Sequence, residues 1–179
     1  CGTCTVLGDG KTTRACSPMR SEREGKSIVT VEGASEKDKE VYAYAVGTAG
    51  AVQCGFCSPG MGMSAKVMID VNPDPSRLEV IAAIRNNICR CTGYKKIIDG
   101  ILLSARIFRE NLPVADNSGI ALVGDAIQRI DAREKVLGTG EYPDDTHLDG
   151  LIYGSAVRSE YPRAKVLEDH AGGAQAPEG

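Results

Sequence analysis

The 179-residue sequence predicts an α+β fold, and three observations support this prediction. Short β-rich runs fill residues 1–33, the apolar spacing becomes helical from residue 35, and two further apolar runs lie near the end. Hydrophobic residues make up 42% of the chain and charged residues 25%, as in ordered globular proteins. We therefore expect several small folded parts and not a disordered chain.

The first part is predicted to contain three short strands. Asp9-Gly10 separates two β-rich runs at 5–7 and 12–15, and this dipeptide favours a tight hairpin turn. Residues 27–31 form a third run of strand-forming residues before Glu32-Gly33. Because three strands of this length cannot bury a core alone, residues 1–33 are expected to be the C-terminal piece of a small β domain.

Residues 35–112 are predicted to form a small bundle of four helices, near 37–50, 59–71, 76–86 and 94–110. Ser35 and Ser76 each precede an acidic residue by three positions, a spacing typical of helix caps. Ser58 places a cap residue before Pro59 at the first position of the second helix. The fourth helix carries one apolar stripe, made of Ile97, Ile98, Ile101, Leu102, Ala105 and Phe108.

The rest of the chain shows weaker patterns. Residues 113–145 have mixed polarity and little periodicity, which predicts a connector along a surface. Residues 151–157 and 164–167 are predicted strands within a final part, 146–179, that is too short to fold alone. We expect this part to be the truncated start of an α/β domain.

Charge and hydropathy exclude two classes of partner. The formal net charge of −3 argues against a nucleic-acid binder that works through a basic face. The sequence contains no apolar run long enough for a membrane span and no apolar segment after a basic start. The expected location is the cytoplasm, with neither nucleic acid nor membrane as a partner.

The seven cysteines form one group of three and one group of four. They are Cys1, Cys4, Cys16, Cys54, Cys57, Cys89 and Cys91. An odd number would leave one thiol outside a closed set of disulfides. Short paired spacings are instead typical of metal and iron–sulfur sites, where tight loops each supply two ligands.

In the group of four, Cys54 and Cys57 precede the second helix, and Cys89 and Cys91 lie between the last two helices. Helix ends supply N–H groups that stabilise thiolates electrostatically. Three hypotheses follow: a [2Fe–2S] cluster, a structural zinc ion, or disulfides. The Cys-x-Cys spacing is unusual for zinc and awkward for disulfides, so the cluster is the leading hypothesis.

The group of three fits part of the plant-type cluster pattern C-x4-C-x2-C…C. Cys1, Cys4 and Cys16 match its second, third and fourth ligands, and the first ligand would lie five residues before Cys1. The alternative is that Cys1 is a processed N-terminal cysteine, for example a lipid-modified one. We expect three ligands of a second [2Fe–2S] cluster.

These motifs resemble the iron–sulfur part of the xanthine dehydrogenase/aldehyde oxidoreductase family of molybdenum hydroxylases. The resemblance rests on CGTCTV at 1–6, EG at 32–33, AVQCGFCSPGM at 51–61 and NICRCTGY at 87–94. It implies a ferredoxin-like β-grasp domain followed by a four-helix [2Fe–2S] domain. A weaker similarity over residues 123–159 resembles the start of the family's molybdenum-binding catalytic part, fused without an intervening flavin domain. The family has eight cluster cysteines and a complete β-grasp domain, and its catalytic part extends well beyond the segment that resembles it here. The chain is therefore expected to be truncated at both ends.

The resemblance also implies site residues, cofactors and partners. It assigns Gln53 to contact with the molybdopterin-type cofactor and Cys91 to the cluster ligand nearest that cofactor. It implies that electrons leave the molybdenum site through the helical cluster and then the ferredoxin-like cluster. The implied partners are the rest of the molybdenum catalytic part and an FAD-binding subunit or other electron acceptor. No substrate-hydroxylating residue is expected in this chain.

The sequence therefore predicts an iron–sulfur electron-transfer module of a molybdenum-dependent oxidoreductase. The main alternative is a structural scaffold in which the four helical-domain cysteines bind one zinc ion. A thiol-disulfide redox protein is a third hypothesis. It would require a thioredoxin-like βαβ setting, which the sequence lacks.

Overall fold

The structure, a computed structural model, describes residues 1–17, 24–114, 122–125, 127–156 and 158–168. It divides into a compact unit, Cys1–Glu141, and a second unit, Tyr142–Gly179. The first unit combines a small sheet with helices, which confirms the predicted α+β class at this level.

The sheet has three antiparallel strands in the order β2-β1-β3. These strands are β1 (Thr5–Gly8), β2 (Lys11–Arg14) and β3 (Ile28–Val29). Asp9 and Gly10 both have positive φ, +49° and +75°, as a two-residue hairpin turn between twisted strands requires. The hairpin prediction is confirmed, whereas the third strand is shorter than predicted.

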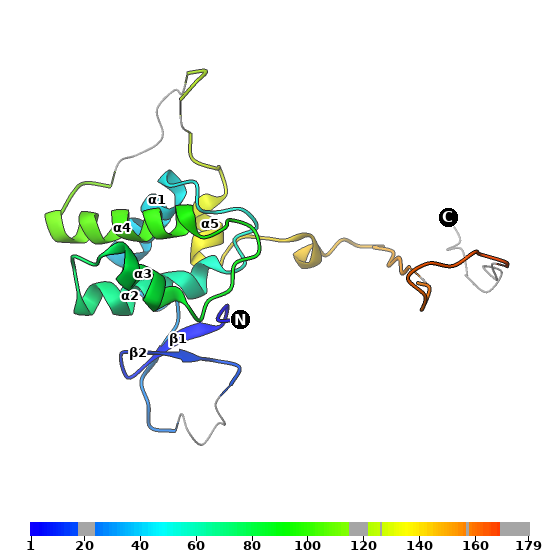
Figure 1. The fold of residues 1–179 in the computed structure, drawn as a ribbon, viewed down its shortest axis with the longest axis horizontal. Helices are drawn as coiled ribbons and strands as arrows, with labels where there is room; N and C mark the ends of the chain where they lie inside the picture. Colours follow the sequence, from blue (N-terminus) through cyan, green and yellow to red (C-terminus); the bar gives the residue numbers. More distant parts are fainter. Residues whose placement is uncertain (18–23, 115–121, 126, 157, 169–179) are drawn as a thin grey trace. The chain divides into compact units, whose positions relative to one another are not determined.

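The four predicted helices are present, and β1 lies against α2 (Figure 1). They are α1 (Glu36–Thr48), α2 (Ser58–Val71), α3 (Arg77–Ile84) and α4 (Lys95–Glu110). Ser35 caps α1 by accepting from the backbone N–H of Asp38, and Ser76 forms a capping box with Glu79. Ser58 was predicted to cap α2, but it is the first residue of this helix, and Cys57 occupies the cap position. None of the described helices is long and apolar enough to cross a membrane.

The hydrophobic core lies among α1, α2 and α4 and is closed by α3 and by a fifth helix, α5 (Ala132–Leu137). Ala45, Ala65 and Val80 are fully buried, so the helix backbones approach closely at these points. On α4, Ile97, Ile98, Ile101 and Ala105 are buried, and Leu102 and Phe108 pack against the core from its edge. The predicted apolar stripe of this helix is therefore confirmed.

The segment predicted as a plain connector, residues 113–145, contains helical structure. α5 packs against α1 and α2, with Ala132 and Val136 each only 2% exposed. A short 3-10 helix, η2 (Pro143–Asp145), follows. The sequence pattern did not reveal α5 because a helix of six residues is too short to show an apolar period, and tertiary contacts hold it.

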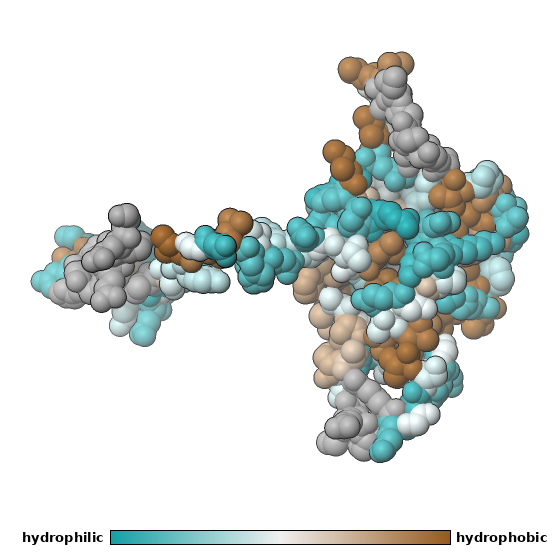
Figure 2. All heavy atoms as spheres, turned by 180° about the vertical axis from the view of Figure 1, so that it is seen from behind, coloured by the Kyte–Doolittle hydropathy of each residue, from teal (hydrophilic) through white to brown (hydrophobic). Residues whose placement is uncertain are grey.

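The strands predicted at 151–157 and 164–167 do not form among the described residues of these ranges; Val157 lies outside them. Apolar side chains of this segment, such as Ile152 and Leu167, are 67% and 84% exposed. Figure 2 shows apolar side chains on the surface of the segment that follows α5. Isolated strands need a hydrogen-bonded partner strand, and the described part of this unit supplies none.

Candidate iron–sulfur centre

The four cysteines of the helical domain come together as two sulfur pairs. Cys54 and Cys57 lie at the turn before α2, and Cys89 and Cys91 lie in the loop between α3 and α4. The Sγ atoms of Cys54 and Cys91 are 3.6 Å apart. The Cys57 thiol donates a hydrogen bond to Cys89. Each pair thus takes one cysteine from each loop.

This pairing fits a two-iron cluster, in which four thiolates bind two irons, two to each. A structural zinc ion instead requires all its ligands around one point. Among the described residues, which include all seven cysteines, no three cysteine, histidine or acidic side chains converge on a single ion position. All seven cysteines are free thiols in the structure. The donor set therefore fits a [2Fe–2S] cluster better than the zinc alternative.

The two pairs differ in their exposure to water. Cys54 and Cys91 are exposed, whereas Cys57 and Cys89 are half-buried. Burial, together with the hydrogen bond that it donates to Cys89, raises the pKa of the Cys57 thiol to about 12. Burial acts in the same direction on Cys89, but hydrogen bonds from Thr92 and from the backbone lower the pKa of its thiol overall. One side of the site therefore faces the protein interior and the other faces solvent.

Local hydrogen bonds shape the loop that carries Cys89 and Cys91. The hydroxyl of Tyr94 accepts a hydrogen bond from the backbone N–H of Cys89 at 2.8 Å and donates one to the carbonyl of Asn87 at 3.2 Å. The Thr92 hydroxyl lies 3.2 Å from the Cys89 Sγ. Gly93 and Tyr94 both adopt positive φ, which turns the chain sharply into α4. The loop is held by its own residues in the shape that presents the two thiols.

The β-hairpin brings together two cysteines of the first group. Cys4 precedes β1 and Cys16 follows β2, and antiparallel pairing places their Sγ atoms 3.2 Å apart. Contacts with the side chain and backbone of Cys16 lower the pKa of the Cys4 thiol. Cys1 is exposed, and its thiol contacts the hydroxyl of Thr3 at 3.6 Å. The structure thus forms one of the two ligand pairs that a second cluster needs.

Asn87 joins the loops that carry the two cysteine groups. Its side-chain amide donates to the carbonyl of Gly2 at 2.9 Å and to the hydroxyl of Thr5 at 3.2 Å, and it accepts from Ser64 at 2.8 Å. The neighbouring backbone N–H of Ile88 donates to the carbonyl of Cys1 at 2.7 Å. Asn87 is only 4% exposed, so these bonds form away from water. The two cysteine loops are therefore one connected structure.

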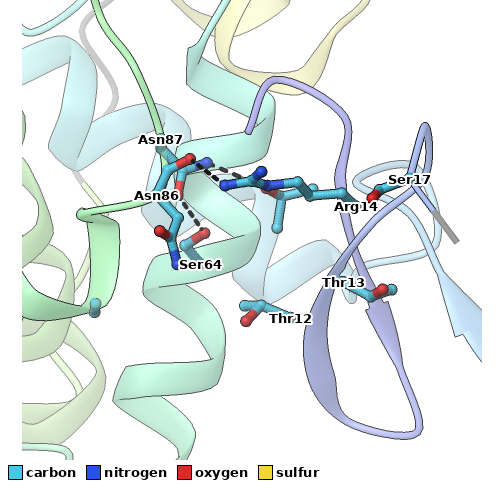
Figure 3. Close-up of a pocket in the computed structure, with 9 residues that line it drawn as sticks. Thr12, Thr13, Arg14, Ser17, Ser64, Asn86 and Asn87 are labelled. Carbon is cyan, nitrogen blue, oxygen red and sulfur yellow. Dashed lines mark hydrogen bonds between the residues drawn. The ribbon is translucent and has the colours of Figure 1, made fainter. Parts of the chain in front are cut away.

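An open polar groove of about 490 Å³ lies along this junction, between the hairpin and the helices (Figure 3). Arg14 crosses it and donates to the carbonyl of Asn86 at 3.5 Å, and Figure 3 shows Ser64 and Asn87 on the helical side. None of the seven cysteines lines it. We assign the groove to the contact between strands and helices and not to the cysteine chemistry.

The structure also places two residues beside the site that the sequence analysis did not identify. Arg129 donates to the carbonyl of Gln53 at 2.7 Å, and the side chain of Lys135 covers Gly55. Both come from the segment predicted as a connector. Its one sequence signal was the weak similarity over residues 129–135, which does not indicate that it packs against the cysteine loop. The predicted cofactor-contact residues Gln53 and Cys91 are both exposed.

Residues 30–102 match the [2Fe–2S] binding domain family. An aldehyde oxidoreductase from Megalodesulfovibrio gigas is 34% identical over 178 residues, which cover 93% of this chain and 20% of that protein. The aldehyde oxidoreductase structure from Desulfovibrio desulfuricans is 39% identical, with a TM-score of 0.70 over 81% of this chain and 17% of that one. Quinoline 2-oxidoreductase from Pseudomonas putida is 40% identical, with a TM-score of 0.53 over 62% of this chain and 70% of that one.

The chain belongs to the xanthine dehydrogenase/aldehyde oxidoreductase family of molybdenum hydroxylases. The matched [2Fe–2S] domain contains all four cysteines of the two sulfur pairs. The chain spans about a fifth of the length of the aldehyde oxidoreductases that it matches. The molybdenum hydroxylase family predicted from the cysteine motifs is thus confirmed.

Proposed function

We propose that this chain is the iron–sulfur electron-transfer module of a molybdenum-dependent oxidoreductase. The observation that carries the proposal is the formation of two sulfur pairs, Cys54 with Cys91 and Cys57 with Cys89, inside the matched [2Fe–2S] domain. A [2Fe–2S] cluster bound at these thiolates accepts and releases one electron at a time. The module itself breaks no substrate bond.

The chain's own residues hold this site rigid and partly dry. Cys57 and Cys89 lie against the core; Cys57 caps α2, and the backbone N–H of Cys89 donates to the hydroxyl of Tyr94, the residue that caps α4. Gly55, with φ of +82°, shapes the turn between Cys54 and Cys57. Burial and hydrogen bonds to sulfur are the means by which a protein tunes the potential of a cluster. A rigid site also needs little rearrangement when its charge changes.

Cys1, Cys4 and Cys16 are proposed as three ligands of a second [2Fe–2S] cluster. The paired thiols of Cys4 and Cys16 support this role. Gln53 and Cys91 are proposed to face the molybdopterin-type cofactor of the intact enzyme, and their exposure beside the cysteine loop is compatible with such a contact. No residue of this chain is assigned to substrate hydroxylation.

The proposed domain boundaries follow the sequence analysis. Residues 1–33 are proposed to be part of a ferredoxin-like β-grasp domain and residues 35–112 the helical [2Fe–2S] domain. Residues 146–179 are proposed as the start of the catalytic part. In this proposal the exposed apolar side chains of residues 148–167 pack against the rest of that part. An FAD-binding subunit or another acceptor is the proposed electron partner.

Metal analysis of anaerobically purified protein tests the proposal against the zinc alternative. We expect a coloured protein that contains iron and acid-labile sulfide in equal amounts and little zinc. The combined variant Cys54→Ala/Cys57→Ala should lose the iron of the helical site. A colourless protein with stoichiometric zinc and no sulfide would overturn the proposal in favour of a structural scaffold.

A further inference from the structure

The segment around α5 returns across the turn that carries Cys54 and Cys57. Arg129 donates from its guanidinium to the carbonyl of Gln53, the residue directly before Cys54. The same guanidinium forms an ion pair with Asp131. On the next turn of the segment, Lys135 lies over Gly55, the residue directly after Cys54. Two cationic side chains therefore lie against the residues directly before and after Cys54 in the sequence.

Lys135 is buried to a degree that is unusual for a lysine. It is 8% exposed, whereas lysine side chains mostly lie at the surface of proteins. A Cβ atom placed on Gly55 would lie 2.5–3.0 Å from three carbon atoms of the Lys135 side chain. Only glycine fits at position 55 with the lysine in this place. The Lys135 Nζ lies 3.8 Å from the Asp131 carboxylate.

Two cations of this segment, Arg129 and Lys135, lie next to the cysteine turn. Both cations pair with the carboxylate of Asp131. Reduction of an iron–sulfur cluster adds one negative charge to it. A fixed positive charge that is shielded from water stabilises the reduced form, because electrostatic interactions are stronger where the effective dielectric constant is low.

We propose that the positive charge of Lys135 raises the reduction potential of the cluster held by Cys54, Cys57, Cys89 and Cys91. Arg129 supports it by tying the segment to the carbonyl of Gln53. The proposal rests on the proposed function, since it requires that a [2Fe–2S] cluster binds at these cysteines. Lys135 belongs to α5, so a helix outside the matched [2Fe–2S] domain would then adjust the potential of its cluster.

Potentiometric titration of the helical cluster in the full chain, monitored by EPR, tests the proposal through three variants. Lys135→Met removes the charge and keeps the side-chain stem that packs on Gly55. We expect a ratio of reduced to oxidised cluster about tenfold lower at a fixed potential, which is 59 mV for a one-electron couple. Lys135→Arg keeps the charge and should restore the potential. Lys95→Met removes a lysine whose side chain is 80% exposed and should change nothing.

An intact cluster with an unchanged potential in Lys135→Met would overturn the proposal, as would an equal fall in Lys135→Met and Lys135→Arg. If Lys135→Met does not retain its cluster, Arg129→Met provides the second test, because it removes a cation from the same segment. Arg129→Met should lower the potential in the same direction, and an unchanged value would then overturn the proposal. A wild-type chain without any cluster would contradict the proposed function itself, so the two failures are distinguishable.

Discussion

A single buried amide, that of Asn87, joins the loops of both cysteine groups. Its NH₂ group donates to the carbonyl of Gly2 and the hydroxyl of Thr5, and its oxygen accepts from Ser64. A buried polar group that loses its partners costs free energy, because it has no water to replace them. Removal of this side chain would leave the Gly2 carbonyl and two hydroxyls with fewer partners at the junction.

We predict that Asn87→Ala lowers the free energy of unfolding by about 1–3 kcal/mol. The neighbouring Asn86 is exposed and interacts through its backbone carbonyl. Asn86→Ala should therefore change the stability by less than about 0.5 kcal/mol. Thermal or denaturant unfolding of the two variants measures the difference, and equal losses would show that the Asn87 side chain does not hold the junction.

At the scale of one helix, α2 presents two glycines to different surroundings. Gly60 faces the cysteine loop of the first group, where a Cβ atom would collide with the carbonyl of Gly2 and lie 2.7 Å from that of Thr3. Gly62 has open space at the position of a Cβ atom. The absence of a side chain at Gly60 lets the loop that follows Cys1 rest directly on the helix backbone.

The substitutions Gly60→Ala and Gly62→Ala should therefore change stability in opposite directions. Gly60→Ala is expected to destabilise the protein by about 1–3 kcal/mol, because backbone atoms must move to admit the methyl group. Gly62→Ala should stabilise it by about 0.5–1 kcal/mol, the usual helix preference of alanine over glycine. Denaturant unfolding checks the pair; a stable Gly60→Ala variant would mean that the loop does not pack on α2 as described.

The success of prediction from sequence differed between elements for physical reasons. Helices α1 and α3 were predictable because Ser35 and Ser76 satisfy the backbone N–H groups at their starts. The hairpin was predictable because Asp and Gly readily adopt the positive φ values that its turn requires at positions 9 and 10. Local chemistry encodes these features within a few residues.

Features that depend on distant contacts were not predictable from local patterns. α5 is held by its packing against α1 and α2, where Ala132 and Val136 are buried. Its six residues are too few to show the apolar period of a helix. The burial of Lys135 likewise depends on contacts that its sequence neighbours do not indicate. The cysteine motifs located the candidate site, whereas the pairing of Cys54 with Cys91 and the bridging role of Asn87 required the three-dimensional structure.

For the whole molecule, all seven cysteines and α5 lie in the first compact unit, Cys1–Glu141. A chain that ends at Glu141 should therefore keep the iron content and the reduction potential of the helical site. A chain that ends at Asn111 lacks α5 and should unfold at a lower temperature, because Ala132 and Val136 no longer close the core. Iron analysis and thermal unfolding compare the two. Equal melting temperatures would contradict the role given to α5.

EPR of the anaerobically reduced chain tests most directly whether the four helical-domain cysteines bind one [2Fe–2S] cluster. We predict one dominant S = 1/2 signal that Cys91→Ala abolishes and that Cys16→Ala leaves unchanged. The first group should contribute little, because Cys1, Cys4 and Cys16 supply only three ligands within these 179 residues. Absence of the signal, or its full retention in Cys91→Ala, would contradict the claim.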